Sequence, residues 1–88
     1  MIRWTRYMLR KSQLRGFALA GIEEIVRYSS ERYCDSITGR RIAVGRIRGL
    51  LVLVAYEQQG EEMTPITVHE TTRQQINERL RHGRFSHE

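Results

Sequence analysis

The run Leu50-Leu51-Val52-Leu53-Val54-Ala55-Tyr56 is the longest apolar stretch of the chain. No polar side chain alternates with the apolar ones, so a strand formed here would have no face suited to water. Such a run predicts a strand in the interior of a sheet, covered on both faces. It is far too short to span a bilayer, which takes about 20 apolar residues in a helix.

The segments on either side of this run also predict strands. Residues 40–47 alternate, with Ile42 and Val44 on one face, and Arg48-Gly49 makes a tight connection into the apolar run. A polar loop follows, and residues 63–69 predict the next strand, in which Pro65 indicates an edge position or a bulge. A weaker strand is expected at residues 30–35, before a turn at 36–39.

Three helices complete the expected order of elements. Residues 4–14 and 18–28 have helical periodicity, and Gly16 suits the left-handed end of the first helix. The last helix starts at Thr71 or Thr72, because each threonine has a glutamine three residues later. We therefore expect an α+β domain with two N-terminal helices, an antiparallel four-stranded sheet and a C-terminal helix. We place the helices on one side of the sheet and leave its other face open and basic.

The composition bounds the class of protein. The chain has 88 residues, which predicts one domain over 1–88, and 15 basic against 10 acidic residues give a net charge of +5. All basic residues except Lys11 are arginines, whose planar guanidinium suits phosphate. The basic residues fall into three clusters, Arg3, Arg6, Arg10, Lys11 and Arg15, then Arg40, Arg41, Arg46 and Arg48, then Arg73, Arg79, Arg81 and Arg84. Such clustering favours a polyanion partner, above all nucleic acid, over an acidic protein partner or a merely solvated surface.

The location and cofactor content follow from what the sequence lacks. Cys34 is the only cysteine, which fits a reducing compartment, and no secretory leader or transmembrane segment is recognised, so we expect a cytoplasmic protein. No zinc-binding set, phosphate-binding loop or dinucleotide fingerprint is present. We therefore predict no metal and no cofactor.

The junction from Pro65 to Gln75 carries the leading candidates for chemistry. It predicts a strand that turns within two residues into a capped helix, which brings His69 near Arg73 and near the free N–H groups of a helix start. His69 can carry a proton near neutral pH, and Arg73 can hold a phosphate. The structural alternatives are a histidine bonded to the helix cap and an arginine paired with Glu70 or Glu78.

Other residues are candidates by their positions. Lys11 lies inside an apolar helical stripe, where its ammonium group either reaches solvent or is held in a cleft. Glu57, at the end of the apolar run, is the best-placed carboxylate for a general base, with a solvated loop residue as the commoner alternative. For Tyr7 and Tyr56, core packing is expected over stacking on a base. Arg40, Arg41, Arg46 and Arg79 are the predicted RNA contacts, with ion pairs or solvated side chains as the alternative.

Three segments carry a resemblance to a known family, Gln13-Leu14-Arg15-Gly16-Phe17, Gly39-Arg40-Arg41-Ile42-Ala43-Val44-Gly45-Arg46 and Ile66-Thr67-Val68-His69-Glu70-Thr71-Thr72-Arg73. In their order and spacing they resemble the BrnT-type toxins, which belong to the RelE-like group of small ribonuclease toxins. In those toxins the position of His69 is commonly arginine, and many members carry histidine where this chain has Tyr7. The resemblance implies a toxin that cleaves RNA and a neighbouring antitoxin, often with a ribbon-helix-helix DNA-binding domain.

The sequence hypothesis is therefore the toxin of a type II toxin–antitoxin pair, acting as a metal-independent endoribonuclease. Its predicted catalytic residues are His69, Arg73, Lys11 and Glu57. Two alternatives remain, a nucleic-acid-binding module without catalysis and an interaction subunit whose basic face meets an acidic protein. The sequence predicts neither the RNA target nor the oligomeric state.

Overall fold

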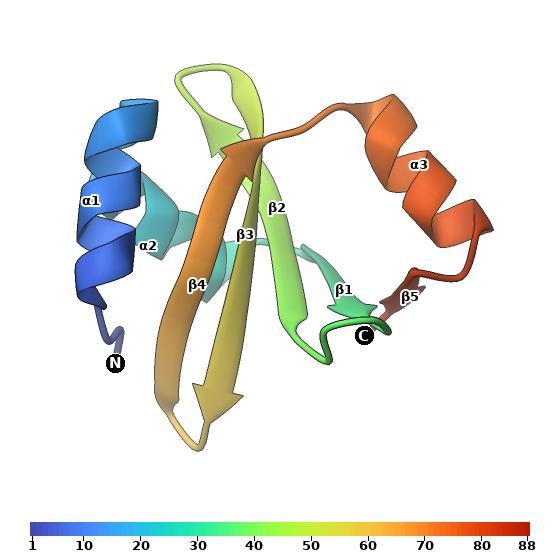
Figure 1. The fold of residues 1–88 in the computed structure, drawn as a ribbon, viewed down its shortest axis with the longest axis horizontal. Coiled ribbons are helices and arrows are strands. Elements are labelled where there is room, and N and C mark those ends of the chain that lie inside the picture. Colours follow the sequence, from blue (N-terminus) through green and yellow to red (C-terminus); the bar gives the residue numbers. More distant parts are fainter.

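Three helices and a five-stranded antiparallel sheet make up the computed structural model, which describes all residues 1–88 (Figure 1). In chain order the elements are α1 (Arg6–Arg15), α2 (Leu19–Tyr28), β1 (Glu31–Asp35), β2 (Arg41–Ile47), β3 (Leu50–Gln59), β4 (Glu62–Glu70), α3 (Arg73–Arg81) and β5 (Phe85–His87). The strands lie in the order β4-β3-β2-β1-β5. None of the helices has the length and apolar character needed to cross a membrane.

Strand β3 is buried on both faces, as its apolar run predicts. Val52, Val54 and Tyr56 point into a first core beneath α1 and α2. The alternate residues Leu51, Leu53 and Ala55 point into a second core on the opposite face. The sheet therefore separates two hydrophobic clusters, and each cluster needs its own cover of helix.

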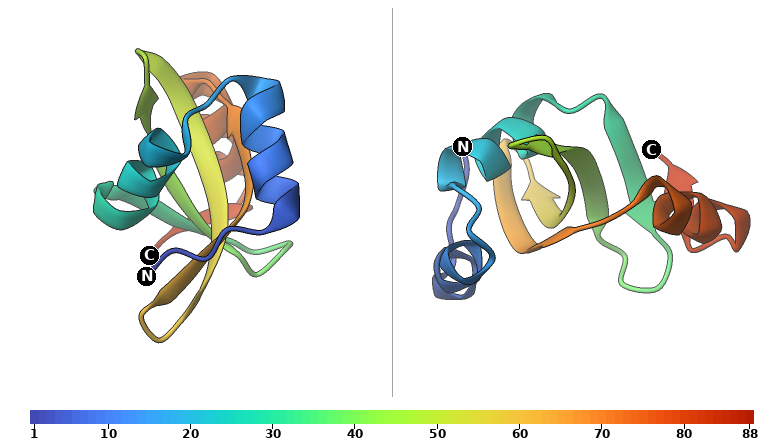
Figure 2. Two further views of the ribbon diagram at one scale, coloured as in Figure 1. Left: turned by 90° about the vertical axis from the view of Figure 1, so that its left-hand side faces the viewer. Right: turned by 90° about the horizontal axis from the view of Figure 1, so that it is seen from above.

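Helices α1 and α2 cover the first core. Met8 of α1 and Ile22, Ile25 and Val26 of α2 are buried there, together with Phe17 from the connection between the helices. In Figure 2 α1 runs along the β4 edge, whereas α2 crosses behind the middle of the sheet. Gly16, with a φ of 72°, ends α1 in the left-handed conformation that the sequence indicates.

Helix α3 covers the second core, so the expectation that all helices share one side of the sheet is wrong. Ile76 is the one buried residue of α3, and it packs in the cluster with Leu53 and with Phe85 of β5. The apolar face formed by Ile42 and Val44 requires this cover. A further difference from the expected four strands is β5, which pairs with β1 at the far edge.

Helices α1 and α3 stand at opposite ends of this face of the sheet (Figure 1). The sheet curves strongly, and both helices project toward the same side at its two ends (Figure 2). We call the part of this face between α1 and α3, where β3 and β4 run (Figure 1), the central hollow. A pocket here is lined by His69 of β4, Leu53 of β3 and Arg79 of α3, and the charges of Lys11 and Arg15 of α1 act on His69. The predicted open sheet face is thus reduced to a hollow with two helical walls.

Local signals place β4 and α3 around this hollow. Pro65 lies in β4, an edge strand, and the pairing of β3 with β4 shifts between Ala55 and Tyr56, so Ile66 is an extra residue opposite this step. Both predictions for Pro65, an edge and a bulge, are confirmed. Thr72 caps α3, because its side chain accepts a hydrogen bond from the Gln75 N–H.

The docking of α3 can be tested at its single buried side chain. Ile76→Ala should lower the free energy of unfolding by about 2–5 kcal/mol, because it leaves a cavity in the second core. The exposed neighbour Asn77 provides the control, and Asn77→Ala should change this free energy by no more than about 0.5 kcal/mol. Urea denaturation followed by circular dichroism measures both. Equal effects of the two substitutions would contradict the docking of α3 on this face.

Candidate functional site

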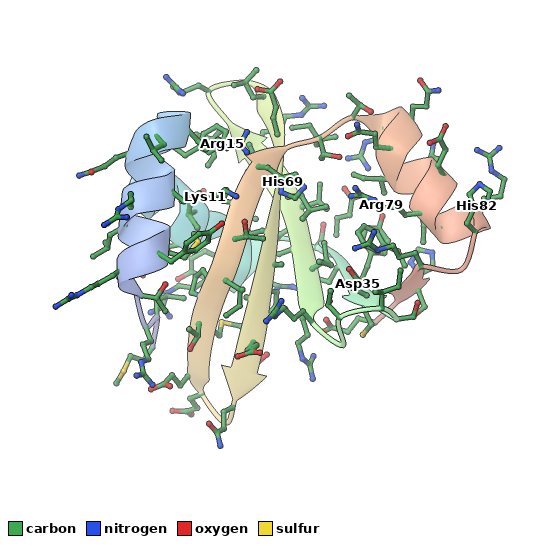
Figure 3. All side chains as sticks on the ribbon, in the orientation of Figure 1. Lys11, Arg15, Asp35, His69, Arg79 and His82 are labelled. Atoms are coloured by element: carbon green, nitrogen blue, oxygen red, sulfur yellow. The ribbon has the colours of Figure 1, made fainter.

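The side chains of the central hollow come from three elements (Figure 3). On β4, Val68 is buried in the first core, so its neighbours Thr67 and His69 point to the opposite face. On α1, Met8 and Ser12 are the buried residues, and the adjacent row at a spacing of four faces the hollow. The set consists of Tyr7, Lys11 and Arg15 of α1, Thr67 and His69 of β4, and Arg79 of α3.

Tyr7 and Lys11 form a polar pair on the α1 wall. The Lys11 ammonium donates a hydrogen bond to the Tyr7 hydroxyl over 3.1 Å and lies 5.5 Å from the centre of the Tyr7 ring. The bond from Lys11 and the nearby Thr67 hydroxyl lower the pKa of Tyr7, and the positive charges of Lys11 and Arg15 add to this effect. Tyr7 is 55% exposed, so the expectation that it packs in the core is wrong. Tyr56, in contrast, is a core residue as expected.

His69 is half-buried at the centre of the hollow. Burial lowers its pKa first, and the positive charges of Arg79, Lys11 and Arg15 lower it further. The imidazole is therefore held in its neutral form at neutral pH and can accept a proton. A histidine whose pKa is lowered by burial and by several nearby cations is in an arrangement typical of anion-binding and catalytic sites.

The cations of the hollow have no carboxylate partners. The six ion pairs of the structure leave out Lys11, Arg15 and Arg79. Arg79 instead lies over the Phe85 ring, with 5.4 Å between its guanidinium carbon and the ring centre. A phosphate placed here would meet three positive charges that no protein anion neutralises.

Arg73 lies outside the hollow, although the sequence predicts it beside His69. Its guanidinium makes two hydrogen bonds with Glu31, of 2.5 and 2.7 Å. The Tyr33 hydroxyl donates to the same carboxylate. Burial, together with this carboxylate, raises the pKa of Tyr33 to about 12. Arg73 thus ties the start of α3 to β1. The ion-pair alternative describes its contacts correctly, with Glu31 as the partner in place of Glu70 or Glu78.

Of the other predicted residues, Lys11, Arg40 and Arg79 lie near His69, and the rest lie apart from it. Glu57 is exposed near the end of β3, where its carboxylate is 3.6 Å from the Arg40 Nε. Arg41 pairs with Glu88 over 3.3 Å, and Arg46 donates to the Gly49 carbonyl in the turn between β2 and β3. The structure therefore joins Lys11, His69 and Arg79 and separates them from Arg73, Glu57, Arg41 and Arg46.

Three residues of the hollow, Tyr7, Arg15 and Thr67, are not among the predicted site residues. Tyr7 and Arg15 lie four residues before and after Lys11, which is a signal for one helix face, whereas the packed stripe of α1 is an adjacent row. Thr67 lies two residues before His69 and so shares its face of the strand. The side chains of the structure form no group of three or more His, Cys, Asp and Glu that could hold a metal ion.

No protein-family model matches this chain, and neither the curated proteins nor the solved structures include a significant match. The resemblance to BrnT-type toxins therefore stays a prediction from the sequence.

The lowered pKa of His69 predicts a pH dependence of stability. Below pH 6.5, the ordinary value for histidine, the unfolded chain binds a proton at this position before the folded protein does. The free energy of unfolding should therefore fall as the pH falls from 6.5 toward the lower pKa of the folded state. Denaturation of wild type and His69→Gln across this range isolates the contribution of His69.

Titration of the His69 ring protons by NMR measures the pKa directly. Arg79→Ala should raise it, because one of the positive charges that oppose protonation is lost, and Lys11→Ala should do the same. Arg81→Ala removes a charge from the same helix outside the hollow and serves as the control. An unchanged His69 pKa in Arg79→Ala and Lys11→Ala would contradict the electrostatic description of the hollow.

Proposed function

We propose that the protein is a metal-independent endoribonuclease that acts in the cytoplasm as the toxin of a type II toxin–antitoxin pair. The observation that carries the proposal is the central hollow, where a neutral, half-buried histidine lies near Lys11, Arg15 and Arg79, none of which is paired with a carboxylate. The net charge of +5 and the sequence resemblance support it. The RelE-like assignment of the fold belongs to the same proposal.

The residues of the hollow suffice for cleavage of RNA by its own 2′-hydroxyl. Neutral His69 accepts the 2′-OH proton while the 2′-oxygen attacks the phosphorus atom. Lys11, Arg15 and Arg79 stabilise the negative charge that grows on the phosphorane oxygens. Tyr7, whose pKa is lowered, donates its proton to the departing 5′-oxygen. The products are a 2′,3′-cyclic phosphate and a 5′-hydroxyl.

The proposed protein partner is an antitoxin, with a ribbon-helix-helix DNA-binding domain as the resemblance implies. A partner that neutralises this enzyme has to block the hollow or its approaches. Because the exposed rim of the hollow is basic, an acidic segment of the antitoxin is the chemistry that fits it.

One observation favours the alternative of a nucleic-acid-binding module without catalysis. Arginines outside the hollow also lack carboxylate partners, namely Arg6 and Arg10 on α1 and Arg46 and Arg48 at the turn between β2 and β3. Such residues can follow a phosphate backbone without any chemistry. The same surface suits the second alternative, an acidic protein partner.

Cleavage of a labelled single-stranded RNA in the presence of EDTA tests the proposal. His69→Ala should slow cleavage by about 10²–10⁴-fold through loss of the proton acceptor. Arg79→Ala should slow it by about 10²–10³-fold through loss of one charge at the phosphorane. His82→Ala and Arg81→Ala are the matched controls, because these exposed residues lie on or beside the same helix and outside the hollow.

The same assay separates the competing assignments. Arg73→Ala should leave cleavage near the wild-type rate, since Arg73 is paired with Glu31 away from His69. Strong loss in Arg73→Ala with normal activity in Arg79→Ala would place the site at the strand-to-helix junction instead. Salt-dependent RNA binding with no cleavage would contradict the nuclease proposal in favour of a binding module, whereas co-purification of an acidic protein without RNA binding would favour the interaction subunit.

A further inference from the structure

A small pocket opens into the central hollow on the side of α3. Its volume is about 120 Å³, and His69 and Arg79 belong to both the pocket and the hollow. Leu53, Ala55 and Phe85 give it apolar walls. If His69 acts in RNA cleavage, a nucleotide next to the scissile phosphate lies beside this pocket. The inference therefore rests on the proposed function.

The polar groups of the pocket are mainly hydrogen-bond donors. Arg40, Arg79 and Arg84 line it, and a guanidinium donates but never accepts. The Arg40 Nε is buried without a hydrogen-bond acceptor, because Glu57, at 3.6 Å, is too distant for a hydrogen bond. A buried donor without an acceptor is costly, so a ligand oxygen within its reach would be favoured.

The one carboxylate of the pocket is already occupied. Asp35 is 5% exposed, and its Oδ1 accepts hydrogen bonds from the N–H groups of Ile37 and Thr38. Arg84 contacts both carboxylate oxygens, with its closest nitrogen 3.2 Å from Oδ2. Burial raises the pKa of Asp35, but the contacts with Arg84 and the two backbone hydrogen bonds together outweigh it. The pKa of Asp35 is therefore held below its usual value, and the carboxylate stays ionised. A ligand amino group would therefore compete with Arg84 for this acceptor.

Size and chemistry together select a class of ligand. A cavity of about 150 Å³ is filled by a single benzene ring, so a pocket of this size suits one six-membered ring. Unpaired bases are recognised through contacts to their faces and hydrogen bonds to their edges. A ring with two carbonyl oxygens and no exocyclic amino group matches the donors of Arg40 and Arg79. Of the four RNA bases only uracil has this composition.

We propose that the pocket lined by Arg40, Arg79 and Ala55 binds a uracil base, and that it directs cleavage to the phosphate beside that base. Arg40 and Arg79 donate to the carbonyl oxygens, and the apolar walls contact the ring. Arg79 thereby contacts both the base and the phosphate.

Four DNA strands that each contain one ribonucleotide, rU, rC, rA or rG, test this inference. Because each strand has a single 2′-hydroxyl, the rate reports on one base. We expect the rU strand to be cleaved at least about tenfold faster than each of the others, the effect of one matched group in a pocket. Equal rates, or a faster rate for rC, rA or rG, would overturn the assignment to uracil.

Variants locate the preference in the pocket. Arg40→Gln should bring the ratio of rU to rA cleavage toward one, and Ala55→Val should do the same by narrowing the pocket. Arg27→Gln, which removes the partner of Glu23 on α2, should leave this ratio unchanged. Thermal unfolding confirms that each variant is folded. An unaltered ratio in both folded pocket variants would overturn the proposal.

Binding of the free nucleotides distinguishes this inference from the proposed function. Uridine monophosphate should bind at least about tenfold more tightly than adenosine monophosphate by NMR titration, and Arg40→Gln should remove the difference. Selective binding of uridine monophosphate without cleavage of any strand would support the pocket and contradict the nuclease. Cleavage of all four strands at one rate would support the nuclease and contradict the uracil pocket.

Discussion

The architecture depends on a single constraint, the burial of both faces of β3. Its alternating residues fill two cores, so cover is needed on two sides of one sheet. The N-terminal helix pair covers the first core and α3 covers the second. Because α1 runs along β4 while α3 sits over the other end of the sheet, a hollow remains between them. The candidate site is thus a consequence of how this strand is buried.

The hollow concentrates charge that the protein itself does not neutralise. Glu31 binds Arg73 at the start of α3, and neither residue lies in the hollow. Burial of His69 beside Lys11 and Arg79 disfavours its protonated form, which is a cost to stability at low pH. An anionic ligand would relieve this repulsion. A basic cavity that favours a neutral imidazole when empty and can charge it when an anion binds is suited to phosphate chemistry.

Much of the fold follows from the sequence, and the failures have physical causes. The apolar run, Pro65 and the Thr72 cap are local signals, and the strands and helices that they predict are present. The side of the sheet on which α3 packs depends on tertiary contacts and has no local signal. The apolar run alone, however, already requires cover on both faces of the sheet. Strand β5 has three residues, too few for a periodic pattern. The partner of Arg73 is 42 residues away, so proximity along the chain favoured the wrong neighbour. The structure brings the predicted residues His69 and Lys11 near each other, but the row from Tyr7 to Arg15 can be recognised only once the orientation of α1 is known.

The location of the RNA is the central claim, and one measurement addresses it directly. Isotope-labelled protein can be titrated with a short single-stranded oligonucleotide whose 2′-hydroxyls are replaced by fluorine, so that cleavage is blocked. The account predicts that the largest NMR shift changes occur at Thr67 and His69 and along the Lys11 face of α1. If the largest changes instead occur on α2, or at Arg48 and Gly49 in the turn between β2 and β3, the RNA binds elsewhere and the account is contradicted.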